Sequence, residues 1–278
     1  MLGACIVDRE NFTNFGMYSR SGLWNISDYP PPEVRNSTAV SPSLLKQQES
    51  ATNSCSVLRN VRALKIIAYD NFGEFVSTGS AVALNWNGKT VYVTNRHITN
   101  GRAGFFLIDA SGNWTETRVI NSEGNIFSSD HQKDSLKNMA AIDLALLAPE
   151  NPDTLSIKSS SILDTGSYNG PVGAMGFPSG TYGWTIAESF SEKNYLVVYN
   201  EEPFYSQSGT SGGGVYSCET GNLVGLTFST PFLPFVVDLK TNKFKQVKVL
   251  EDLKDGELVA QYAIHASQIR TFLLNSIH

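Results

Sequence analysis

Short runs of β-branched and aromatic residues, separated by turn-forming residues, begin near residue 61 and continue almost to the end of the chain. Such runs have the length and composition of β-strands, and Gly, Asn, Asp and Ser punctuate them. The first group comprises the runs 61–69, 75–84, 89–95, 104–109, 115–120 and 141–148. A looser stretch with further turn signals follows at 149–169 and separates this group from a second one.

The second group contains a similar number of strand-like runs and ends in a helical pattern. Its runs are 171–177, 184–190, 195–200, 213–217, 223–229 and 258–264, with a hairpin of 234–239 and 244–250 before the last one. Ile269, Phe272 and Leu273 recur at helical spacing and predict a helix over 266–275. Two groups of about six strands predict an all-β protein built from two small packed β-barrels.

Residues 1–55 lack this regularity. They contain Tyr29-Pro30-Pro31-Pro32 and a polar run at 46–54, with little periodicity. We expect an irregular N-terminal extension that either wraps around the body or is partly mobile. The pattern thus divides the chain into the extension 1–55, a first barrel over 56–160, and a second barrel with the helix over 161–278.

Composition supports a turn-rich β protein and excludes several functional classes. Ser, Thr and Asn make up 72 of 278 residues, and charged residues only 17%. The net charge of −5 disfavours a nucleic-acid partner, which would require a basic face. No apolar run approaches 18 residues, so we expect no membrane span, and the start lacks the basic region of a signal peptide. These features predict a cytoplasmic protein.

The three cysteines give no recognisable redox or metal pattern. Cys5, Cys55 and Cys218 form no CxxC pair, and no zinc site can be drawn from them with Cys/His spacing. Their odd number argues against a disulfide framework. We therefore expect Cys218 to be a free thiol, either packed or on the surface, and a fold that does not depend on disulfides.

Three local features contain the side chains that are best suited to chemical reactions. His97 follows a predicted strand directly, so rigid backbone would hold its imidazole beside a cleft. Asp143 lies within an apolar run, where an unpaired carboxylate costs several kcal/mol and therefore requires a partner. Ser211 lies in the turn GTSGGG at 209–214, whose residues tolerate unusual backbone angles and close approach.

Each feature alone has an ordinary structural explanation. A strand-end histidine is usually structural, an aspartate in a strand is usually exposed at an edge, and a glycine-rich turn is usually only a turn. A phosphate-binding loop is disfavoured because the chain has no GxxxxGK[ST] motif and Val215-Tyr216 resumes a strand after the turn. The three features become informative only in combination.

The order His97, Asp143, Ser211, with separations of 46 and 68 residues, resembles that of the chymotrypsin/trypsin-like serine endopeptidases. The similarity extends over roughly residues 57–275. Its further motifs are TGSAV at 78–82, VGAMGFP at 172–178, LVGL at 223–226 and YAIH at 262–265. The motifs at 172–178 and 262–265 are similar to HtrA-type protease domains, although we expect no PDZ domain, and compact virus-encoded proteases fit equally well. The resemblance implies an active site between two six-stranded barrels.

The resemblance, together with the chemistry of these side chains, implies a role for each residue. Ser211 would be the nucleophile, His97 its general base and acid, and Asp143 the group that orients the imidazole. The N–H groups of Gly209 and Ser211 would form the oxyanion hole. No metal or cofactor is needed for this chemistry. By family alignment, the substrate pocket would comprise Tyr205, Ser206, Phe228, Ser229 and Thr230.

The departures from the family pattern matter as well. Thr210 stands where digestive-type relatives carry an aspartate that pairs with a newly released amino terminus, so we expect no activation switch of that kind. No Asp lies at the base of the predicted pocket, which favours a small or medium neutral P1 residue. Asp130 and Asp134 are alternative triad acids, although they lack the buried-strand setting of Asp143. His265 is expected to be structural.

Several functions are compatible with these residues. The first is a serine endopeptidase acting on a protein substrate, either a virus-encoded enzyme that processes a polyprotein or a cytoplasmic housekeeping or regulatory protease. The second is a pseudoprotease that uses the cleft or the N-terminal extension for binding, against which the complete set of His97, Asp143 and Ser211 counts. The third is an esterase without peptidase activity.

Overall fold

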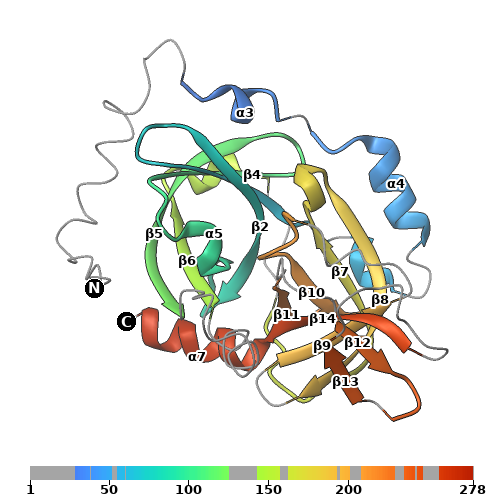
Figure 1. Cartoon of the computed structure of the whole chain (residues 1–278). Helices are drawn as coiled ribbons and strands as arrows, with labels where there is room; N and C mark the ends of the chain where they lie inside the picture. Colours follow the sequence, from blue (N-terminus) through green and yellow to red (C-terminus); the bar gives the residue numbers. More distant parts are fainter. Residues whose placement is uncertain are drawn as a thin grey trace.

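Antiparallel strands dominate the structure, a computed structural model in which two barrels lie side by side (Figure 1). It describes residues 29–37, 39–51, 55–59, 61–124, 143–156, 162–192, 195–200, 208–228, 235–241, 243–246 and 257–277.

The first barrel is closed by six antiparallel strands in the order β1-β2-β3-β6-β5-β4. Its strands are β1 (Leu64–Tyr69), β2 (Phe75–Trp86), β3 (Lys89–Thr94), β4 (Gly104–Ile108), β5 (Trp114–Gly124) and β6 (Asp143–Pro149). Alternate residues point inward, and the interior is filled by a buried cluster that includes Ile66, Ala81, Phe105, Leu107 and Leu147.

The second barrel follows the same plan. Its strands are β7 (Asn169–Gly176), β8 (Gly183–Glu192), β9 (Tyr195–Asn200), β10 (Gly214–Ser217), β11 (Leu223–Thr227) and β14 (Glu257–His265). They run in the order β11-β10-β7-β8-β9-β14, and pairing of β11 with β14 closes the ring. The hairpin of β12 (Phe235–Asp238) and β13 (Lys243–Gln246) extends the sheet outward from β14.

The largest apolar core lies between the two barrels. It combines outward-facing residues of the first barrel, such as Val82 and Leu144, with residues of the second barrel. Helix α7 (Ala266–Ser276) completes it with Ile269, Phe272 and Leu273, all buried. The prediction of two packed six-stranded barrels with a C-terminal helix is confirmed. None of the helices in the described ranges combines the length and apolar character that crossing a membrane requires.

The described residues 29–37, 39–51 and 55–59, which comprise the described part of the N-terminal extension and the turn after it, are called here the strap because they run along both barrels (Figure 1). It contains α3 (Pro32–Arg35), α4 (Pro42–Ala51) and the 3-10 turn η3 (Ser56–Arg59). Much of the polar run predicted as irregular is therefore helical, and α4 packs Leu44 and Leu45 against the inter-barrel core.

On the first barrel, the strap covers apolar side chains that the barrel interior does not accommodate. Val34 is buried in a cluster on the outward side of β1 and β4, formed with Ile67, Tyr69, Phe106 and Ile108. The strap's Tyr29 also donates a hydrogen bond to Glu116 Oε2 (2.9 Å), and the Tyr69 hydroxyl donates to Oε2 of the strap's Glu33 (3.0 Å). Because this outer face is strongly apolar, the strap is part of the folded body.

On the second barrel, one buried polar contact anchors α4. The hydroxyl of Tyr182 donates to Oε1 of Gln48 (3.0 Å), and Gln48 is fully buried. Burial raises the pKa of Tyr182 to about 12, so the phenol keeps the proton that it donates. The strap therefore holds positions on both barrels.

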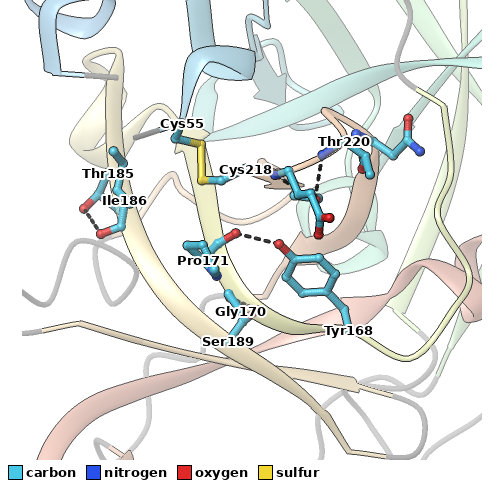
Figure 2. Close-up of a disulfide and its surroundings, with 12 residues drawn as sticks. Cys55, Tyr168, Gly170, Pro171, Thr185, Ile186, Ser189, Cys218 and Thr220 are labelled. Carbon is cyan, nitrogen blue, oxygen red and sulfur yellow. Dashed lines mark hydrogen bonds between the residues drawn. A yellow bond between two sulfur atoms is a disulfide. The ribbon is translucent and has the colours of Figure 1, made fainter. Parts of the chain in front are cut away.

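Cys55, directly before η3 of the strap, forms a disulfide with Cys218, which directly follows β10 (Figure 2). The expectation of a free Cys218 thiol and of a fold independent of disulfides is therefore wrong. An odd number of cysteines leaves one unpaired but does not prevent a single bond. The partners are 163 residues apart, so no local spacing pattern reveals the pairing.

Removing this disulfide with Cys55→Ala and Cys218→Ala together is expected to lower the free energy of unfolding by about 3–5 kcal/mol. The bond closes a loop of more than 160 residues, and losing it restores conformational freedom to the unfolded chain. Urea denaturation of the double variant and of the oxidised wild type measures the difference. Cys5→Ala, which removes a thiol but leaves this pair, is the control. An unchanged denaturation midpoint in the double variant would contradict the expectation.

Candidate active site

His97 lies in a single helical turn that directly follows a barrel strand. β3 ends at Thr94, Asn95 is the N-cap, and α5 (Arg96–Thr99) turns the chain so that His97 faces the start of β6. Thr94 pairs with Ala145 in the β3–β6 register, which places Asp143, two residues earlier on β6, beside this turn. The strand register itself therefore brings the two side chains together.

Asp143 contacts His97 at two points. Its Oδ1 accepts a hydrogen bond from the main-chain N–H of His97 (2.9 Å), and its Oδ2 lies 2.6 Å from Nδ1 of the same residue. The side-chain amide of Asn95 also donates a hydrogen bond to the Asp143 main-chain carbonyl (3.0 Å). Asp143 is 4% exposed and the His97 side chain 27% exposed. A carboxylate only accepts, so this contact places the hydrogen on Nδ1 and leaves Nε2 as the basic nitrogen.

Phe228 lies against the imidazole of His97. The two rings are nearly perpendicular, at 88°, with centroids 5.7 Å apart, and Phe228 is buried directly after β11. This residue, predicted in the substrate pocket, thus comes from the second barrel to contact the histidine of the first. The other predicted pocket residues, Tyr205, Ser206, Ser229 and Thr230, lie outside the described residues.

Ser211 lies in the turn at 208–213, which leads directly into β10 and is called here the serine turn. Gly209 and Gly212 have φ angles of 96° and 84°, in the region that favours glycine. A Cβ on Gly209 would collide with the carbonyl oxygen of Phe177, and one on Gly212 with that of Ser80. The turn is therefore pressed against both barrels and requires glycine at these two positions.

Hydrogen bonds from β11 hold the serine turn in shape. The hydroxyl of Thr227 donates to the carbonyls of Thr210 (2.6 Å) and Gly213 (2.9 Å). The main-chain N–H of Gly213 donates to the Thr210 carbonyl as well (2.9 Å). Thr210 is buried. Neutral hydroxyl and amide groups thus stabilise the turn around Thr210.

Two further hydrogen bonds connect the serine turn to the strand that leads to His97. The Ser80 N–H donates to the Ser211 carbonyl (2.8 Å), and the Thr94 hydroxyl donates to the Ser80 carbonyl (2.6 Å). Thr94 is three residues before His97. The structure therefore joins His97 and Asp143 directly and places Ser211 at the junction of the two barrels, two hydrogen bonds from Thr94.

Ser80 and Asn95 are functional candidates that the sequence reasoning missed. Both are fully buried polar residues beside apolar strand positions, which is the same signal that singled out Asp143. Among the predicted alternatives, Asp130 and Asp134 lie outside the described residues. His265 caps α7 by accepting from the Ser267 N–H, and burial lowers its pKa.

The topology of two closed six-stranded barrels defines a chymotrypsin-like fold, with the residues described above at the junction of the barrels. No protein-family model matches the chain, and no curated protein does. Among solved structures, one that matches is Rv3671c from M. tuberculosis H37Rv, crystallised in an inactive form with a serine replaced by alanine. It is 12% identical, with a TM-score of 0.46 over 86% of this chain and 96% of that one. The fold assignment therefore stands on the strand topology.

Proposed function

We propose that this protein is a serine endopeptidase. The observation that carries the proposal is the two-point contact of Asp143 with His97, which fixes the imidazole at the barrel junction with Nε2 as its basic nitrogen. A buried carboxylate paired in this way is what a histidine requires to act as a base towards a serine. A third contact, the ring of Phe228, further restricts the imidazole.

In the proposed reaction, Ser211 Oγ attacks the carbonyl carbon of the scissile peptide bond while His97 Nε2 takes its proton. The imidazolium is stabilised by Asp143 and returns the proton to the leaving amine, so that an acyl-enzyme forms on Ser211. Water activated by His97 then releases the acid product. The N–H groups of Gly209 and Ser211 bind the negative oxygen of each tetrahedral intermediate, and each contributes about 3 kcal/mol.

The cellular setting is the part of the proposal that the disulfide changes most. Structural disulfides persist in oxidising compartments and are rare where thiols are kept reduced. The bond between Cys55 and Cys218 therefore argues against the cytoplasmic setting expected from the sequence, and we propose an oxidising environment instead. Polyprotein processing by a virus-encoded enzyme stays a prediction, and cleavage sites flanking this domain in a longer precursor would support it.

Covalent labelling with an organophosphonate tests the proposal directly. We expect one adduct per chain, located on Ser211 by mass spectrometry of the digested protein, together with hydrolysis of members of a peptide library. The same library reports whether P1 is small and neutral, as the sequence predicts. A wild-type chain that stays unlabelled would identify a pseudoprotease that binds without cleaving, and ester turnover without peptide cleavage would identify an esterase.

A further inference from the structure

Ser80, on β2 of the first barrel, makes three hydrogen bonds to two separate segments, the serine turn and the residue that follows β7. Its hydroxyl donates to the Gly209 carbonyl (2.7 Å) and accepts from the Phe177 N–H (2.9 Å). Its main-chain N–H donates to the Ser211 carbonyl (2.8 Å). The side chain is fully buried, so water does not compete for these bonds. One hydroxyl of the first barrel thus joins the serine turn to the segment that follows β7.

The segment after β7, the turn η5 (Pro178–Gly180), also contacts the serine turn directly. The Ser179 N–H donates to the Ser208 carbonyl (2.6 Å). Ser179 has φ 49° and ψ 30°, a left-handed conformation that is uncommon for residues other than glycine. Such conformations persist where the surrounding structure enforces them, often at functional sites.

This contact fixes the orientation of the peptide unit between Ser208 and Gly209. In a trans peptide the C=O and N–H point in opposite directions. Since the Ser208 carbonyl points at Ser179, the Gly209 N–H points away from η5. An oxyanion hole needs this N–H, and not the carbonyl, to face the reacting oxygen. The position of η5 against the serine turn therefore selects between a competent and an incompetent peptide orientation.

The space around Ser80 is shaped for this contact. A Cβ on Gly176, the last residue of β7, would lie 2.8 Å from the Ser80 hydroxyl oxygen and 3.4 Å from main-chain atoms of Thr210. A Cβ on Gly209 would collide with the Phe177 carbonyl oxygen. The two glycines allow β7 and the serine turn to approach close enough for one hydroxyl to bridge them.

We propose that Ser80 is a positioning residue that holds η5 against the serine turn and thereby keeps the Gly209 N–H in the orientation that binds the oxyanion. The inference rests on the proposed function and deepens it. Ser80 touches neither the substrate nor the reacting atoms. It acts through the Gly209 carbonyl and the Phe177 N–H, which would both be left buried without a partner if the hydroxyl were removed.

The test is Ser80→Ala in the full chain. We expect kcat to fall by about 10- to 100-fold, while KM changes by less than about 3-fold. This fall in kcat is smaller than the one that removal of a whole oxyanion-hole donor causes. The affinity of a peptide boronic acid, whose tetrahedral adduct occupies the oxyanion hole, should fall by the same factor as kcat. Active-site titration corrects kcat for any inactive fraction, so a loss of folded protein alone would leave the corrected value unchanged.

Ser189→Ala is the matched control, because Ser189 is equally buried on β8 and its hydroxyl donates to a single carbonyl, that of Gly170. Ser189→Ala should lower the stability and leave kcat unchanged. If Ser80→Ala does not fold, Ser80→Cys, with a weaker donor of similar size, should lower kcat by about 3- to 10-fold at unchanged KM. Normal kcat and boronate affinity in the folded Ser80 variant would overturn the inference. An unlabelled, inactive wild type would overturn the proposed function instead.

Discussion

Replacing Ser211 with alanine is expected to lower kcat by about six orders of magnitude and leave the fold intact. The substitution removes the oxygen that attacks the peptide bond in the proposed mechanism. The Ser80–Ser211 hydrogen bond uses main-chain atoms only, so it persists in the variant. Peptide hydrolysis followed over long incubations measures the residual rate, and thermal unfolding verifies the fold.

A matched control separates this effect from the loss of any buried serine near the turn. Ser217, at the end of β10, is also buried, and its hydroxyl accepts from the main-chain N–H groups of Glu219 and Thr220. Ser217→Ala should lower stability but retain kcat and organophosphonate labelling. Turnover near the wild-type rate in Ser211→Ala would remove the nucleophile assignment, whatever the control shows.

Asp143→Asn is expected to lower kcat by about four orders of magnitude near neutral pH. The asparagine oxygen can still accept from the His97 main-chain N–H, so the turn that carries His97 keeps its anchor. The amide nitrogen would then face Nδ1, and because it only donates, it favours the tautomer with the hydrogen on Nε2. That tautomer cannot take the proton of Ser211. Steady-state kinetics and nitrogen chemical shifts of the imidazole measure both consequences.

The two alternative acids supply the controls for this prediction. Asp130→Asn and Asp134→Asn are matched in chemistry to Asp143→Asn and are expected to change kcat by less than about 3-fold. A large loss in one of them, together with near-normal kcat in Asp143→Asn, would transfer the orienting role to that residue. A loss in Asp143→Asn alone would support the pairing with His97 that the structure contains.

Local patterns were sufficient for the architecture but not for the long-range contacts. Strand periodicity and turn residues predicted the two barrels, because the alternation of apolar and polar residues within each strand shows which of its faces is buried. The residues themselves indicated only that Asp143 needs a partner, and it was the family resemblance that implied His97, since the β3–β6 register that joins them is a property of the folded sheet. The roles of Asp143, His97 and Ser211 in catalysis stay predictions.

The strap shows why the long-range contacts could not be predicted from the sequence. Its helix α4 is largely polar, and the buried Gln48 accepts a hydrogen bond from Tyr182, which lies far along the chain. In the sequence, Ser80 looks like any other small strand residue. Its role in joining β7 and the serine turn is visible only in the folded structure. The bond between Cys55 and Cys218 depends likewise on the docking of the strap to the second barrel. These contacts arise from tertiary packing, which short stretches of sequence do not reveal.

The disulfide also determines what a break in the main chain would do. Any single peptide bond cut between Cys55 and Cys218 yields two fragments that stay covalently joined. That interval contains His97, Asp143 and Ser211, so every nick between these residues leaves all three in one molecule. Such a nicked chain would migrate as one species in a non-reducing gel and as two after reduction, and it would keep its complete set of candidate catalytic groups through proteolytic damage.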